Sequence, residues 1–92
     1  MTIDLSHLSV EQEFGVYRTV DARRDVANTI HQGTADIGVD DIARRLYYAT
    51  GEVEIPAHMV KEITNIVMHS ALVAYVKRAV LDALNGKEVA DQ

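Results

Sequence analysis

The chain has no cysteine among its 92 residues. Disulfide bonds, thiolate zinc sites and cysteine nucleophiles are therefore excluded. The opening residues, Met1 to Leu8, contain neither the basic region nor the apolar region of a signal peptide. We therefore expect a cytoplasmic protein.

Basic residues are also scarce, because nine Lys and Arg face fourteen Asp and Glu, which gives a formal net charge of −5. A protein that binds nucleic acid through its phosphates needs a basic surface. Three small basic pairs occur, at Arg23-Arg24, Arg44-Arg45 and Lys77-Arg78, and each has aspartates nearby in the sequence. These pairs are typical of solvated helix faces, so we expect nucleic-acid binding to be weak or absent.

Long hydrophobic runs are missing as well. The most apolar stretch, Ile63 to Val76, is interrupted by Asn65, His69 and Ser70. It is too short and too polar to cross a bilayer. No interaction with a membrane is expected.

Glycine and proline are absent from Ala57 to Leu84, which predicts one uninterrupted helix of about 28 residues. Pro56 precedes it and Asn85-Gly86 follows it as a stop signal. Such a helix is roughly 42 Å long, whereas a globule of this size is about 32 Å across. The excess length and the apolar residues around the second half predict a homodimer built on this helix. The residues expected at the dimer interface are Ile63, Val67, Met68, Leu72, Val76 and Val80.

The remaining sequence predicts two shorter helices. Ser9 and Gln12 fit a capping box, so we expect a helix from Val10 to His31 that stops at Gly33 and is bent or broken near residues 21–25. A second helix is expected from Val39 to Thr50. Its buried face is predicted to comprise Val39, Ile42, Leu46 and Ala49. Glu52 to Ile55 is predicted as an extended turn or a tiny strand, and residues 1–8 and 87–92 as flexible tails. The sequence thus predicts a single all-α domain with three helices.

No catalytic constellation is visible. The four histidines do not pair with one another at helical spacing, and His58 with Glu62 lacks further metal ligands. There is no glycine-rich phosphate loop, and Tyr47-Tyr48 is expected to place one ring in the core and one at its edge. We therefore expect no enzyme activity, no cofactor and no metal. His69 lies in the apolar part of the long helix, where burial would shift its titration, so it is a candidate pH sensor.

Part of the chain resembles a small family of enteric bacterial regulators, the biofilm-development and acid-resistance regulators that connect two-component phosphorelays. The resemblance spans roughly residues 20–68. It rests on Val26 to Gly33, on Ile42 to Leu46 and on Met59 to Val67, which fall at similar spacing. It implies a helical homodimer that acts on another regulator.

These observations predict a small regulatory or adaptor protein, bacterial or from a phage, that acts by protein–protein contact on a larger regulator. Small size, acidic charge and the missing catalytic residues favour this function. The alternatives are a DNA-associated transcriptional regulator and a structural subunit of a phage or secretion assembly.

Overall fold

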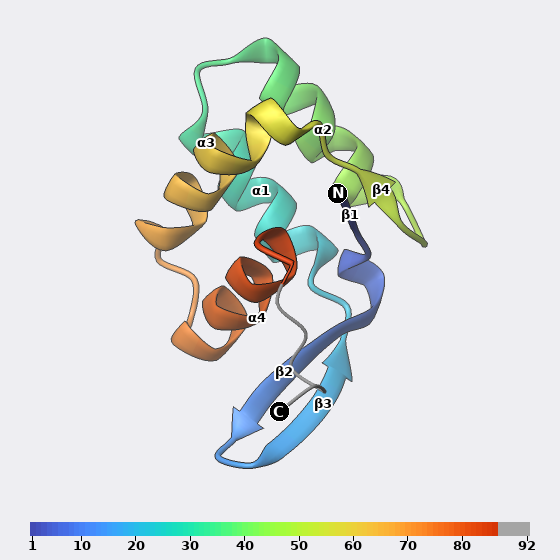
Figure 1. Ribbon diagram of the computed structural model, residues 1–92, viewed down its shortest axis with the longest axis vertical. Helices are drawn as coiled ribbons and strands as arrows, with labels where there is room; N and C mark the ends of the chain where they lie inside the picture. Colours follow the sequence, from blue (N-terminus) through green and yellow to red (C-terminus); the bar gives the residue numbers. More distant parts are fainter. Residues whose placement is uncertain (87–92) are drawn as a thin grey trace.

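Four α-helices and two small antiparallel sheets make up residues 1–86, the part of the chain that the computed structural model describes (Figure 1). The prediction of an all-α, three-helix fold is therefore wrong. In chain order the elements are β1 (Thr2–Ile3), the 3₁₀ turn η1 (Leu5–His7), β2 (Leu8–Glu13), β3 (Val16–Val20), α1 (Arg23–Gly33), α2 (Ile37–Tyr48), β4 (Val53–Glu54), α3 (Ala57–Met68) and α4 (Ala74–Leu84). The predicted tail at residues 87–92 lies outside the described part.

The first half of the predicted Val10–His31 helix is a β-hairpin. β2 and β3 pair antiparallel, with Leu8 opposite Val20 and Val10 opposite Arg18. Gly15 in the turn has φ of 78°, which glycine adopts without strain. The Glu11 carboxylate accepts a hydrogen bond from the Gly15 N–H at 2.9 Å. The alternation of Leu8 and Val10 with polar residues thus follows the strand period of two, which prevails over the helical pattern.

Residues 1–8 are not a flexible tail. β1 pairs with β4, so that Ile3 lies opposite Val53, and the Ala22 N–H donates to the Leu5 carbonyl oxygen at 2.8 Å. The side chains of Ile3, Leu5 and Leu8 are all buried. The N-terminal segment is therefore part of the hydrophobic core. Of the two alternatives for Glu52 to Ile55, an extended turn or a tiny strand, the structure shows the strand, β4.

α1 and α2 form an antiparallel pair next to each other in sequence. α1 begins at Arg23, whose N–H donates a hydrogen bond of 3.1 Å to the Asp21 carboxylate. The helix ends at Gly33, as expected. α2 begins two residues before its predicted start, because Asp36 caps it by accepting from the Gly38 N–H at 2.7 Å. Its predicted face is confirmed for Val39, Ile42 and Leu46, which are buried, while Ala49 is half-buried.

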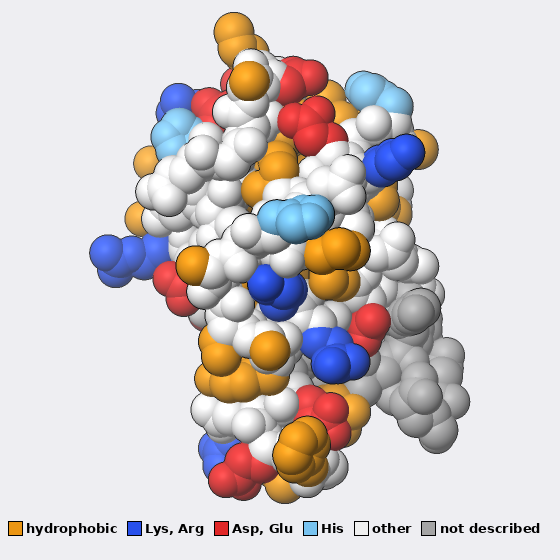
Figure 2. Space-filling view, turned by 90° about the vertical axis from the view of Figure 1, so that its left-hand side faces the viewer, with side chains coloured by type: hydrophobic (Ala, Val, Ile, Leu, Met, Phe, Trp, Pro, Cys, Tyr) orange, Lys and Arg blue, Asp and Glu red, His pale blue; other side chains and the backbone are white. Residues whose placement is uncertain are grey.

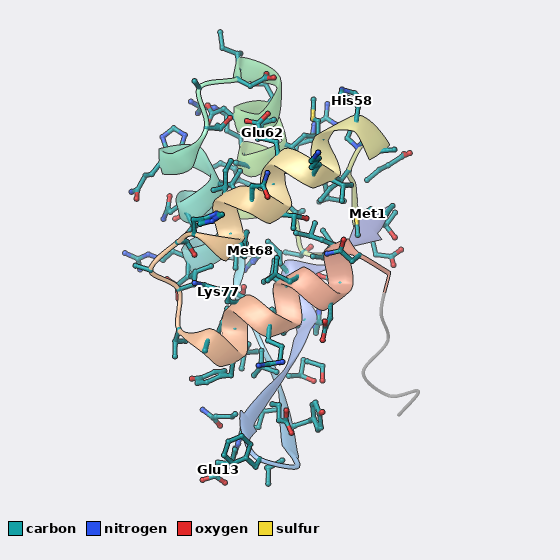
Figure 3. All side chains as sticks on the ribbon, turned by 60° about the vertical axis from the view of Figure 1, so that its left-hand side comes forward. Met1, Glu13, His58, Glu62, Met68 and Lys77 are labelled. Atoms are coloured by element: carbon teal, nitrogen blue, oxygen red, sulfur yellow. The ribbon has the colours of Figure 1, made fainter. Side chains whose placement is uncertain are left out.

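The predicted 28-residue helix is in fact two helices, because α3 ends at Met68 and α4 starts at Ala74. Ser70 Oγ donates to the Val67 carbonyl oxygen at 2.7 Å, and Lys77 Nζ donates to the carbonyls of Met68 and Ser70 at 3.0 and 2.9 Å (Figure 3). These donors satisfy carbonyls that a continuing helix would have used. The turn folds α4 back onto β2, where it buries Ala79, Val80 and Leu84.

Candidate functional site

The residues predicted to form the dimer interface are divided by the break between α3 and α4. Ile63, Val67 and Val80 are buried in the core of their own chain. Leu72 and Val76 are half-buried against that core, and the side chain of Met68 is 48% exposed. The excess helix length that predicted the dimer does not exist, because the helix is split between α3 and α4.

His69 lies at the C-terminal cap of α3 and is exposed. Its Nδ1 lies 2.9 Å from the Asn65 carbonyl oxygen, one turn earlier. The buried setting on which the pH-sensor hypothesis depended is absent, because the turn after α3 leaves His69 at the surface.

A groove of about 210 Å³ lies between α1 and α2, and we call it the α1–α2 groove. The hollow follows from the residue types, because Ala27 and Ala43 are small, buried side chains at the contact between the two helices. The groove is lined by Ala27, Asn28, His31, Ala43, Arg44, Tyr47 and Tyr48. It therefore combines an apolar floor with basic, amide and aromatic groups.

The charged side of this groove is organised by Asp40. His31 Nδ1 is hydrogen-bonded to one oxygen of the Asp40 carboxylate, and Arg44 Nε lies 3.3 Å from the other. The hydrogen bond from His31 and the nearby charges of His31 and Arg44 lower the pKa of Asp40. The Arg44 side chain remains 66% exposed. Asp40 thus orients the Arg44 guanidinium, which stays accessible to a partner.

Two tyrosines form the aromatic end of the groove. The rings of Tyr47 and Tyr48 meet edge to face, with centroids 4.9 Å apart. The expectation that one ring lies in the core is wrong, because both side chains are exposed and Tyr48 is 78% exposed. Tyrosine and arginine are the residue types that most often anchor protein–protein interfaces. Sequence reasoning missed this groove because it forms only when α1 and α2 pack against each other.

The β2–β3 hairpin is the second exposed surface. It projects from the helical body (Figure 1), and hydrophobic and acidic side chains gather at its end at the bottom of Figure 2. Phe14 in the turn is fully exposed, Val16 and Tyr17 are partly exposed, and Glu13 lies at the far end of the hairpin (Figure 3). The alternating pattern and Phe14-Gly15 were the signals that would have identified this hairpin in the sequence.

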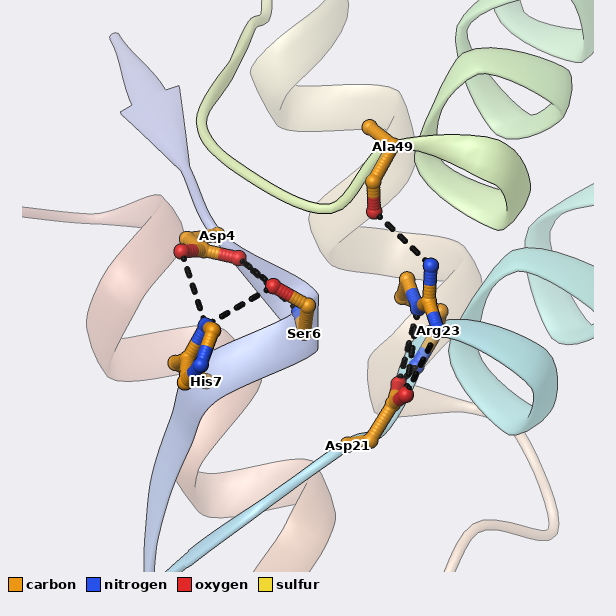
Figure 4. A network of polar contacts seen from close by, with 6 residues as sticks. All are labelled: Asp4, Ser6, His7, Asp21, Arg23 and Ala49. Carbon is orange, nitrogen blue, oxygen red and sulfur yellow. Dashed lines mark hydrogen bonds and ion pairs between the residues drawn. The ribbon is translucent and has the colours of Figure 1, made fainter.

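Several of the basic residues are engaged within the fold. Arg23 Nε and Nη2 donate to the Asp21 carboxylate, at 3.0 and 2.8 Å, and Nη1 donates to the Ala49 carbonyl oxygen at 3.2 Å (Figure 4). The hydrogen bonds from Arg23 lower the pKa of Asp21. In the same view Asp4 accepts from the Ser6 hydroxyl, which lowers the pKa of Asp4. Arg23, Arg44 and Lys77 therefore each have a partner in their own chain.

Within residues 1–86 no group of three His, Asp or Glu side chains is arranged to hold a metal ion. His58 and Glu62 lie one turn apart on α3 (Figure 3), where Glu62 accepts a hydrogen bond from the Thr34 hydroxyl at 2.7 Å. Over the same part of the chain, no helix is both long and apolar enough to span a membrane.

Comparison with known proteins finds no matching family model, no matching curated protein and no matching solved structure.

Proposed function

We propose that this chain is a small cytoplasmic regulatory adaptor that binds a larger protein through the α1–α2 groove. The observation that supports this most is the pairing of exposed Tyr47 and Tyr48 with Arg44 around a hollow floored by alanine. A partner that inserts an apolar or aromatic side chain into this hollow meets the tyrosine rings, and an acidic group beside it meets Arg44. The partner chemistry is thus an acidic and aromatic segment of protein.

The charge distribution favours a protein partner over DNA. The chain carries a net charge of −5, and Arg23 and Arg44 are already paired with Asp21 and Asp40. Each such pairing reduces the number of counterions that phosphate binding would release. The resemblance of residues 20–68 to small bacterial regulators favours the same class of function.

The test compares three purified variants in capturing proteins from the source cell. Tyr48→Ala and Arg44→Ala each remove one anchor of the groove, and Val73→Ala, which is 53% exposed outside the groove, is the matched control. A partner captured by the native chain is then purified and titrated against each variant. We expect each groove variant to weaken binding roughly tenfold or more, as loss of an interface anchor does. The Val73→Ala control should retain the native affinity.

Equal affinity of all three variants for the partner would show that the groove is not the binding surface. DNA is tested separately, by retention on duplex DNA at physiological salt. Retention that falls steeply with salt would favour the DNA-associated alternative.

A further inference from the structure

In the described part of the chain, one edge of the strand β3 is open. Its other edge pairs with β2 along residues 16–20, and over the described residues this sheet has two strands. Within residues 1–86 no backbone hydrogen bond joins residues 16–20 to any segment other than β2. An open edge presents alternate N–H and C=O groups to whatever strand approaches it.

The composition of β3 lacks the devices that normally protect an open edge. Its sequence is Val-Tyr-Arg-Thr-Val, with three β-branched residues, one tyrosine and a single charge at Arg18. The neighbouring strand differs, because β2 carries Glu11 and Glu13 and an irregularity between them. Charges and bulges of that kind discourage pairing with another strand. Of the two edges of the hairpin, β3 is therefore the one suited to pairing.

Within residues 1–86 the far half of the hairpin also lacks support from other elements. α4 packs on β2 and covers Leu8 and Val10, but Phe14, Val16 and Tyr17 remain exposed. A two-stranded hairpin is only marginally stable in water, whereas three or more strands with a covered face are stable. Additional strands would thus stabilise the projecting half.

We propose that β3 pairs antiparallel with β3 of a second copy of this chain, which makes a four-stranded sheet across a two-fold axis. The same strand then supplies the open edge on both sides, so the interface is closed and self-complementary. This interface is independent of the proposed function, because its residues do not line the groove.

Charge and shape select the register of this pair. Centring it on Arg18 sets like charges opposite each other, which is destabilising. Centring it on Thr19 brings the hairpin turn of each copy against the start of α1, at residue 23, of the other copy, which would create a steric clash. A register centred on Tyr17 avoids both problems, and in it Tyr17 faces its own copy while Val16 faces Arg18 of the second copy.

This register is also complementary in charge. Val16 lies opposite Glu13 within the hairpin, so Arg18 of one copy lies two strands from Glu13 of the other, about 10 Å between backbones. Arginine and glutamate side chains extend far enough to approach each other over that span. The turn that carries the fully exposed Phe14 comes alongside Val20 of the second copy. The pairing therefore covers the largest exposed apolar side chain of the hairpin.

The absence of cysteine makes a direct test of the register possible. In the Tyr17→Cys variant the two thiols face each other, with Cα atoms about 5 Å apart, which suits a disulfide. In the Thr19→Cys variant, on the same face of the strand, the Cα atoms lie roughly 14 Å apart, which forbids one. Oxidation with a glutathione buffer should yield a cross-linked dimer with Tyr17→Cys and almost none with Thr19→Cys. Equal cross-linking of the two variants, or none with either, would overturn the proposal.

A second measurement, sedimentation equilibrium, addresses the dimer without cross-linking. Tyr17→Lys places two positive charges face to face at the two-fold axis and should raise the dimer Kd roughly tenfold or more. Gln12→Lys, an equal charge change at an exposed position of β2, should change Kd by less than about threefold. A native chain that stays monomeric at every soluble concentration would refute the pairing, and so would a Tyr17→Lys variant that dimerises like the native chain.

Discussion

Gly33 and Ile66 fix how closely the end of α1 approaches α3. A β-carbon added at Gly33 would lie 2.6 Å from Cγ2 of Ile66. Carbon atoms in contact normally lie 3.5 Å or more apart. Glycine at this position is therefore required by packing between two helices, in addition to ending α1.

Replacing Gly33 with alanine should destabilise the protein. Alanine in place of a helical glycine usually gains about 0.5–1 kcal/mol, but the overlap with the stiff, β-branched Ile66 should cost about 1–3 kcal/mol. We expect a net loss of about 1 kcal/mol in the free energy of unfolding, measured by urea denaturation. Gly51→Ala is the control, because nothing lies within 4 Å of a β-carbon there. Its stability should be unchanged or slightly higher, and a Gly33→Ala variant as stable as the native chain would contradict the packing argument.

The N-terminal segment should contribute strongly to stability. Leu5 is 2% exposed in the core, so Leu5→Ala removes buried methyl groups and leaves a cavity, at a cost of about 2–4 kcal/mol. The comparison is Ile37→Ala at a site that is 79% exposed, where the expected change is within about 0.5 kcal/mol. Thermal or urea unfolding of both variants measures the difference. Equal stability of the two would show that residues 1–8 do not pack as described.

Acid should weaken the contact between α1 and α2. The hydrogen bond from His31, assisted by Arg44, lowers the pKa of Asp40 below its ordinary value of 3.8. The unfolded chain therefore binds a proton at Asp40 more readily than the folded chain does. The stabilisation is complete above about pH 4 and is lost as the pH falls through the lower, folded pKa.

The Asp40→Asn variant should accordingly lose less stability than the native chain between about pH 4 and pH 2. The measurement is a series of urea midpoints across that range. Asp41→Asn, the neighbouring exposed aspartate on α2, makes the same change of charge and serves as the control. If Asp40→Asn and the native chain lose stability in parallel, the contact with His31 does not hold the Asp40 carboxylate in solution.

Part of the candidate site was recoverable from the sequence and part was not. The periodicity of Val39, Ile42 and Leu46 was sufficient to place α2, and with it Tyr47 and Tyr48 at its end. The groove itself was not predictable, because its floor needs Ala27 of α1 to meet Ala43 of α2. The predicted interface residues Ile63, Val67 and Val80 were recognised as apolar. The sequence, however, does not say whether the residues that bury them come from the same chain or from a second copy.

By itself the sequence determined the elements whose signals are local. Gly33 ended α1, the helical period marked α2, and Pro56 set the start of α3, because caps, breakers and periodicity act within a few residues. The tertiary structure alone decided three other features. β1 pairs with β4, about 50 residues away. Residues 8–20 form a hairpin because Leu8 and Val10 are buried beneath α4. α3 ends at Met68, so that Val80 and Leu84 reach the core. In each case burial against a distant segment outweighs the weaker local helical preference.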